Sequence, residues 1–312
     1  MLSRVAERVY WLARYIERAE NTARMIISFH LVSLDMPKTV QLSWKGLVAV
    51  TGNDDVFDAH YQREDERNCV KFLVADQYNP SSVLSSLQAA RENVRTTRDL
   101  VPSEAWEVVN EMYLFARDHI DNGIGKRVRY QFLTEVVQRC QTLTGLLAGC
   151  MSHDAAYDFI RVGRNLERAD MTSRQIDVGA IRYLKKAADP TPYEGLLWTG
   201  ILRSQSGFQM YRQHVKRRIN GVDVVRFLLQ DLPFPRAVAH SLRYVQEALE
   251  RLPRNELPLR LVMQARRHAL DADVDALVAE DRLHAFIDTL QQDIGAIHTA
   301  VADTWFRLDR AA

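Results

Sequence analysis

The sequence contains one charged helical motif twice, about 150 residues apart. Residues 14–24 read RYIERAENTAR, and residues 164–174 read RNLERADMTSR. Arg, Glu, Arg, Ala, Thr and Arg recur at the same positions, while Glu20 is replaced by Asp170. The spacing between the copies exceeds the period of a solenoid repeat, so it predicts two large units rather than many small ones.

Further matches follow the motif in the same order and at nearly the same offset. SWKGLV at 43–48 resembles LWTGIL at 197–202, and VKFLVADQYNP at 70–80 resembles VRFLLQDLPFP at 225–235. Because order and offset are both kept, a tandem duplication explains these matches better than chance does.

Apolar residues recur at helical spacing through most of the chain. From Ser3, a plausible N-cap, they alternate in steps of four and three, which predicts a helix that continues to about Leu34. The same periodicity predicts helices at 80–100, 103–119, 124–150, 155–185, 194–215, 235–252, 258–279 and 282–308. Prolines fall between these segments or at their starts. The β-branched run LVAVTG at 47–52 is short enough to be a helix end.

The predicted fold is therefore all-α, a pseudo-symmetric helical bundle built from two tandem duplicated helical units. The first helical repeat spans residues 1–150, and the second spans residues 151–312. We expect the repeats to pack as one globular unit about a pseudo-twofold axis, with the two motif helices meeting near that axis.

Composition excludes several classes of function. With 41 basic and 40 acidic residues the net charge is +1, so neither nucleic acid nor an anionic membrane is an expected partner. No stretch of 18 apolar residues and no leader-like N-terminus is present, and we expect a cytoplasmic protein. The three cysteines lack metal-ligand spacing and are expected to be buried thiols. No metal is assigned, because no ligand-bearing loop accompanies the motif carboxylates, although a Mg²⁺ site built from them stays an alternative. No cofactor is expected, since no phosphate-binding glycine loop is present.

Helical spacing places the charged positions of the motif on one stripe. Arg14, Glu17 and Arg24 share a face, turned away from the apolar face. One interpretation is a solvated surface with weak Arg14–Glu17 and Glu20–Arg24 pairs, worth about 0.2–0.5 kcal/mol each. The other is a functional site, because both copies keep Arg rather than Lys, and the guanidinium fork binds carboxylate or phosphate through two hydrogen bonds.

The functional interpretation assigns roles to both copies of the stripe. Glu17 and Glu167 are candidate general bases if desolvation raises their pKa values, or they orient the arginines. The arginines that could hold an anionic group are Arg14, Arg24, Arg164 and Arg174.

A second basic cluster lies in ARENVRTTRD at 90–99. Arg91 and Arg98 recur there at helical spacing, and Asn93 offers an amide. Upstream, Asn79 is expected to be an N-cap with Pro80 at the first helical position.

These motifs, in this order, resemble the bacterial alpha-E domain family, a group of unknown function. The resemblance runs through VYWLARYIERAENTAR, NPSSVLSSLQAARENVRTTRD, SEAWEVVN, FIRVGRNLERADMTSR, ILRSQSGFQMYR and FPRAV, and it covers essentially the whole chain. Carried over by position, the motif residues are Arg14, Glu17, Arg18, Glu20, Arg24, Arg91, Asn93, Arg98, Arg164, Glu167, Arg168, Asp170 and Arg174.

The resemblance also implies partners. Family members are typically encoded beside, or fused to, circularly permuted ATP-grasp proteins, and often near transglutaminase-like proteins. ATP-grasp enzymes join carboxylates to amines through acyl phosphates. The resemblance therefore implies a role in amide-bond formation on a peptide or amino-acid-like substrate.

Three hypotheses follow. The chain is an accessory partner of an ATP-grasp ligase that binds a carboxylate- or phosphate-bearing ligand, an enzyme that uses Glu17 or Glu167, or a charged clasp between the two halves. A homo-oligomer is also possible, because a true dimer and a pseudo-symmetric monomer bury similar helix faces.

Overall fold

The computed structural model describes residues 3–37, 40, 42–182 and 193–307. These residues form helices and contain no strand, which confirms the all-α prediction. The predicted helix ends at 185 and 308 lie outside the described residues, as do Pro190 and Pro192.

Sixteen α-helices follow one another along the described chain. In the first half they are α1 (Ser3–Asp35), α2 (Lys45–Thr51), α3 (Asp54–His60), α4 (Glu66–Val74), α5 (Val83–Arg95), α6 (Ser103–Asp118), α7 (Ile120–Ile124) and α8 (Arg129–Cys150), with a 3₁₀ turn at Arg98–Leu100. In the second half they are α9 (Ala155–Arg182), α10 (Glu194–Ser204), α11 (Phe208–Val215), α12 (Gly221–Gln230), α13 (Val238–Leu249), α14 (Glu256–Leu270), α15 (Val274–Ala279) and α16 (Leu283–Val301), with a π-helical turn at Ala302–Phe306.

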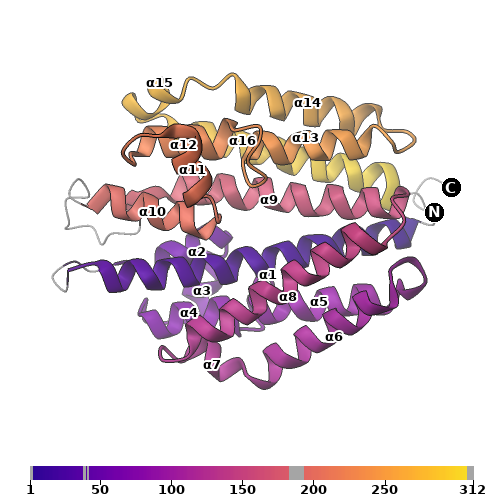
Figure 1. The fold of residues 1–312 in the computed structure, drawn as a ribbon, viewed down its shortest axis with the longest axis horizontal. Helices are drawn as coiled ribbons and strands as arrows, with labels where there is room; N and C mark the ends of the chain where they lie inside the picture. Colours follow the sequence, from indigo (N-terminus) through magenta and orange to yellow (C-terminus); the bar gives the residue numbers. More distant parts are fainter. Residues whose placement is uncertain (1–2, 38–39, 41, 183–192, 308–312) are drawn as a thin grey trace.

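Two long helices, α1 and α9, form the centre of the bundle. They lie side by side and run in the same direction, with α5, α6 and α8 on the outer side of α1 and α13, α14 and α16 on the outer side of α9 (Figure 1). Helix α1 packs against α9, α5, α8 and α10, so nearly every face of it is covered. The helix predicted from Ser3 to about Leu34 is thus the central element of the fold.

The two halves place their helices in the same order. Helices α5 and α8 pack against α1 and α6 packs on these two, as α13 and α16 pack against α9 and α14 packs on them. A tandem duplication, which stays a prediction, would produce this order.

Several helix boundaries differ from the predictions. The segment 194–215 forms two helices because Ser206 has a left-handed backbone, with φ of 52°. The segment 258–279 also divides, where Asp273 accepts a hydrogen bond from the Ala276 amide and starts a new helix. Helix α2 ends at Gly52, whose φ of 66° suits a glycine C-cap, so LVAVTG is a helix end as predicted.

The predicted N-cap at Asn79 is wrong. Helix α5 begins later, with Ser82 as the N-cap that accepts a hydrogen bond from the Ser85 amide. Asn79 instead shapes the preceding turn, since its side chain accepts from the Ser81 amide and donates to the Phe72 carbonyl. An Asn-Pro-Ser-Ser sequence offers two capping residues, and tertiary contacts selected the second.

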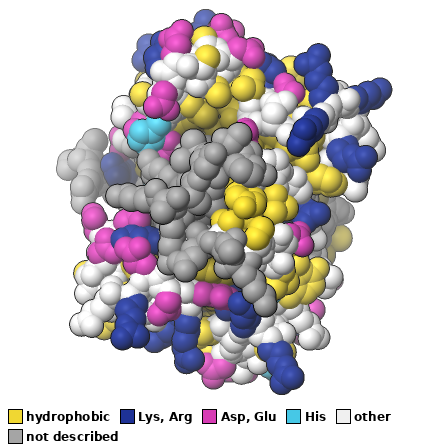
Figure 2. Space-filling model, turned by 90° about the vertical axis from the view of Figure 1, so that its left-hand side faces the viewer, with side chains coloured by type: hydrophobic (Ala, Val, Ile, Leu, Met, Phe, Trp, Pro, Cys, Tyr) yellow, Lys and Arg dark blue, Asp and Glu magenta, His cyan; other side chains and the backbone are white. Residues whose placement is uncertain are grey.

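The surface is mixed in charge. At the end of the molecule formed by α10 and the carboxyl end of α1, basic and acidic side chains surround hydrophobic ones (Figure 2). None of the described helices is long and apolar enough to cross a membrane. Cys69 and Cys140 are buried, as predicted, whereas Cys150 is exposed.

Candidate functional site

Helices α1 and α9 approach each other closely at Gly163. A Cβ atom placed on Gly163 would lie 2.3 Å from the carbonyl oxygen of Tyr10. Only glycine permits this approach, because any side chain would collide with the backbone of α1. The close crossing brings the two copies of the charged motif into direct contact.

Two reciprocal ion pairs join the motif helices. The guanidinium of Arg18 donates from Nε and Nη2 to the two carboxylate oxygens of Glu167, at 2.5 and 3.0 Å. The guanidinium of Arg168 donates in the same way to Glu17, at 2.9 and 2.7 Å. Positions 17 and 18 thus bind positions 168 and 167 through the same two-pronged geometry.

Each glutamate also binds a second arginine, and this arginine comes from a different part of the chain in the two copies. Arg14 donates to Glu167 at 2.7 Å from within the motif. Glu17 instead accepts from Arg236, which lies just before α13, at 3.0 Å.

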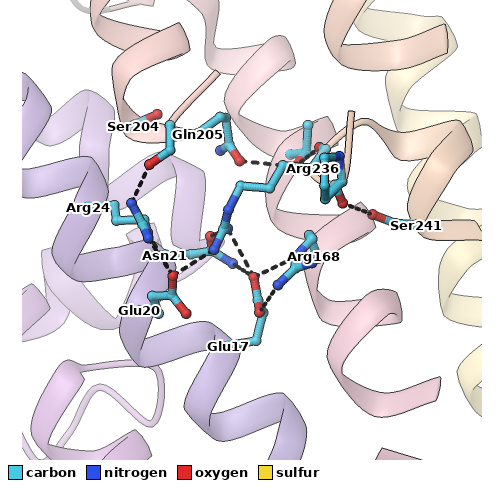
Figure 3. A network of polar contacts seen from close by, with 12 residues as sticks. Glu17, Glu20, Asn21, Arg24, Arg168, Ser204, Gln205, Arg236 and Ser241 are labelled. Carbon is cyan, nitrogen blue, oxygen red and sulfur yellow. Dashed lines mark hydrogen bonds and ion pairs between the residues drawn. The ribbon is translucent and has the colours of Figure 1, made fainter. Parts of the chain in front are cut away.

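Arg236 also binds the neighbouring polar groups of α1. It donates to Glu20 at 2.7 Å and to Asn21 at 2.6 Å, and its side chain points between them and Arg168 (Figure 3). Only 8% of Arg236 is exposed. We did not single out this residue from the sequence. The sequence did contain one indication of its importance: it belongs to the FPRAV segment, which resembles the family and has this arginine directly after a proline.

The charged stripe is not a solvated surface, so that interpretation is wrong. Glu17 and Glu167 are each 1% exposed, and Arg14 is 7% exposed. The predicted Glu20–Arg24 pair is present at 2.7 Å, but Arg14 binds Glu167 across the halves. Helical spacing identified the shared face, whereas the packing of α9 against it determined the partners.

Electrostatics makes both glutamates poor bases. Burial raises the pKa of Glu17, but Arg168 and Arg236 outweigh burial and lower that pKa to about 2. For Glu167, Arg18 and Arg14 likewise outweigh burial and lower the pKa to about 2. A general base near neutral pH needs a raised pKa, so this arrangement disfavours the candidate catalytic role of both residues.

The remaining motif residues extend the cluster outward. Arg24 binds Glu20 and donates to the Ser206 hydroxyl at 2.5 Å. Its counterpart Arg174 binds Asp170 at 3.0 Å. Arg164 lies beside Arg168; burial and that neighbouring positive charge lower the pKa of Arg164.

A polar cavity of about 130 Å³ opens beside the Glu167 copy of the motif. Its lining offers guanidinium, carboxylate and hydroxyl groups, contributed by Arg18, Thr22, Ser81, Glu167, Asp170 and Arg174. A smaller, apolar cavity of about 20 Å³ between α1 and α10 has room for little more than one water molecule. The polar cavity is therefore the candidate binding site.

The second basic cluster lies apart from this site. Arg91 donates to Asn110 of α6 at 2.8 Å, and the guanidinium of Arg98 lies 3.8 Å from the ring centre of Trp106. The Arg91 contact holds α5 against α6, and the Arg98 contact holds the 3₁₀ turn against α6. Among the described residues no hydrogen bond, ion pair or cation–π contact links the side chains of Arg91, Asn93 or Arg98 to the charged motif.

Within the described chain, one group of side chains has the spacing of metal ligands. Asp177, His284 and Asp288 lie close together on the surface, where His284 binds Asp177 through Nδ1 and faces Asp288 at 3.6 Å through Nε2. The hydrogen bond between His284 and Asp177 holds α16 against α9 at this point.

Comparison with known proteins gives a family but no activity. A family model described as a predicted alpha-helical domain with a conserved ER motif matches residues 1–306. Uncharacterized proteins of Mycobacterium bovis and Mycobacterium tuberculosis are 23% identical to the chain over 325 residues. The match covers 96% of this chain and 36% of each relative, so the chain spans about a third of their length. No solved structure matches.

Proposed function

Because the chain belongs to the alpha-E family, we propose that it is an accessory partner of an ATP-grasp-type amide-bond ligase. In this role it binds a carboxylate- or phosphate-bearing peptide or amino-acid-like ligand beside the charged motif. The ligase would supply the ATP chemistry, and both proteins would act in the cytoplasm, where ATP is made. A transglutaminase-like protein is a further candidate partner, from the family resemblance.

An excess of positive charge in a buried or half-buried cluster carries the binding part of the proposal. The motif cluster contains seven arginines, namely Arg14, Arg18, Arg24, Arg164, Arg168, Arg174 and Arg236. It contains four carboxylates, namely Glu17, Glu20, Glu167 and Asp170. Seven positive and four negative charges leave an excess of three. Buried charge without a partner is costly, so an external anion would stabilise this cluster.

The same geometry supports binding rather than catalysis. Both glutamates are saturated by arginine donors and have pKa values of about 2. They position guanidinium groups, which suits recognition of a carboxylate or phosphate. The proposal therefore assigns Glu17 and Glu167 an orienting role.

A structural clasp is the second candidate function. The reciprocal pairs Arg18–Glu167 and Arg168–Glu17 favour it, because they connect the two halves directly. A purely structural clasp has no need of surplus arginines or of a polar cavity, and both are present. Binding accounts for these two features as well as for the ion pairs.

The length of the relatives agrees with a role beside another protein. In the mycobacterial relatives the matched region makes up 36% of the chain, so there the same region is joined to other sequence. A domain that assists a second activity is suited to such an arrangement.

Native mass spectrometry of the tagged protein, purified at low salt from its own host, tests the proposal. We expect a stoichiometric complex with an ATP-grasp protein, or a bound small anion. The amide-forming activity of the ligase, assayed with ATP and a panel of amino acids, should fall at least about tenfold without this protein. Full ligase activity in its absence, together with no co-purifying partner, would refute the accessory role.

A further inference from the structure

Outside the long helices, the two halves differ in the side chain that follows a matching proline. Pro80 and Pro235 occupy matching positions in the two halves, so Ser81 corresponds to Arg236. In the second half the Arg236 side chain fills the space beside Glu17 and Glu20. In the first half the short Ser81 side chain lines the polar cavity beside Glu167 and Asp170. The cavity is thus the space that Arg236 fills in the other copy.

An unpartnered hydroxyl points to what the cavity binds. Thr22 is fully buried and lines the cavity, and its Oγ1 atom has no hydrogen-bond partner among the described residues. The matching residue, Thr172, donates to the carbonyl oxygen of Arg236 at 3.0 Å. A buried hydroxyl without a partner is costly. Thr22 therefore lacks an acceptor oxygen that its counterpart has.

Charge decides between a cationic and an anionic occupant. Although Arg236 itself is a cation, the first copy already has a third arginine, since Arg14 donates to Glu167. In this copy three arginines, Arg14, Arg18 and Arg174, pair with the two carboxylates Glu167 and Asp170, which leaves one positive charge in excess. Arg14 contributes from behind Glu167 through that pair and does not itself line the cavity. Another cation would increase this excess, whereas an anion would cancel it.

We propose that the protein has a single ligand site, the cavity of the first half, and that it holds an oxyanion group of the ligand, a carboxylate or a phosphate. One oxygen accepts from Thr22, and others accept from the guanidinium groups of Arg18 and Arg174. This inference rests on the proposed function for the class of ligand, and it adds the place, the donors and the number of sites. The second copy is closed by Arg236 of the chain itself.

The size of the cavity fits this assignment. On this measure of volume a single water molecule needs about 10–15 Å³, so about 130 Å³ accommodates an oxyanion together with neighbouring atoms. Arg174 retains 30% exposure at the edge, which leaves room for the rest of a ligand to extend toward solvent.

Isothermal titration calorimetry with inorganic phosphate and with L-glutamate tests the site. The key variant is Ser81→Arg, which places the side chain of the second copy into the first. We expect it to weaken the binding of whichever probe binds by at least about tenfold. The matched control is Ser152→Arg, because Ser152 is exposed between α8 and α9, and its affinity should remain within about twofold of the unmodified protein.

A second variant does not depend on filling the cavity. Thr22→Val keeps the shape of the side chain and removes the unpartnered hydroxyl, so affinity should fall several-fold without loss of thermal stability. Thr142→Val, at an exposed position of α8, is its control. Phosphate bound in preference to glutamate would identify a phosphate-bearing ligand, and the reverse would identify a carboxylate.

The outcomes separate this inference from the proposed function. Unchanged binding in both Ser81→Arg and Thr22→Val would overturn the cavity as the site and leave the proposed function standing. Failure of the unmodified protein to bind either probe at about 10 mM would overturn both the site and the binding role. A stoichiometry of two anions per chain would overturn the single site.

Discussion

The Glu17 copy and the Glu167 copy of the motif share their central ion pair and differ in what surrounds it. Each glutamate binds an arginine of the opposite helix through two hydrogen bonds. Around Glu17 the chain supplies Arg236, whereas around Glu167 it leaves a cavity of about 130 Å³. The same arginine–glutamate pair is therefore part of a filled, structural contact in one copy and borders the candidate site in the other.

The Glu17 copy, in which Arg236 fills the space beside the glutamate, should lose more stability than the Glu167 copy when one arginine is removed. Arg236→Ala leaves Glu17 and Glu20 buried without one of their cations, and we expect the free energy of unfolding to fall by about 3–5 kcal/mol. Urea denaturation measures the change. Arg117→Ala, with a side chain 50% exposed, is the matched control and should leave the free energy of unfolding nearly unchanged. A loss below about 1 kcal/mol for Arg236→Ala would mean that this copy is not held by its arginine.

Acid should weaken both copies alike. The folded pKa values of Glu17 and Glu167 are about 2, below their ordinary value of 4.5. Since the folded pKa is the lower one, the stabilisation is complete above about pH 4.5 and is lost as the pH falls toward 2. Urea denaturation at a series of pH values should show unfolding free energy decreasing through this range.

The variant Glu167→Gln should make that decrease shallower, because it removes one of the two titrating groups. Glu92→Gln, at an exposed position, should leave the slope unchanged. Equal slopes for unmodified protein and Glu167→Gln would contradict the lowered pKa of Glu167.

The contact shared by both copies can be tested at Gly163. Gly163→Ala places a Cβ against the Tyr10 carbonyl oxygen, forces α1 and α9 apart, and should cost about 1–3 kcal/mol. Gly145→Ala in α8 is the control, because no atom lies within 4 Å of its added Cβ, and alanine is the better helix former. Thermal melts of the two variants should therefore shift in opposite directions. A neutral Gly163→Ala would show that the helices can separate freely here.

The smallest expected difference in stability between the two copies concerns their last arginines, Arg24 and Arg174. Arg24→Ala removes a side chain that is 11% exposed and binds both Glu20 and Ser206, so we expect a loss of about 1–2 kcal/mol. Arg174→Ala removes its counterpart, which is 30% exposed, and solvent screening should limit the loss to about 0.5 kcal/mol. Urea denaturation of both variants compares the losses directly, and equal losses would remove this distinction between the copies.

The sequence was sufficient for the helical class and for the identity of the central helix. Regular apolar spacing from Ser3 onward predicted α1 nearly to its end, and the doubled motif identified α9 as its counterpart. Short helices such as α3, α4, α7 and α12 were not predicted, because segments of five to ten residues carry too few turns to show a period. Their limits follow from packing and from caps such as Asp65, which accepts from the Asn68 amide.

For the site, local spacing and tertiary packing determined different things. The period of the helix placed Arg14, Glu17 and Arg24 on one stripe, because that depends only on the geometry of the backbone. It could not show that the stripe is buried, since burial depends on the packing of another helix 150 residues away in sequence. Nor could it show that Arg236 completes one copy while Ser81 leaves the other open, because ion pairs across a bundle depend on distances that only the assembled fold determines.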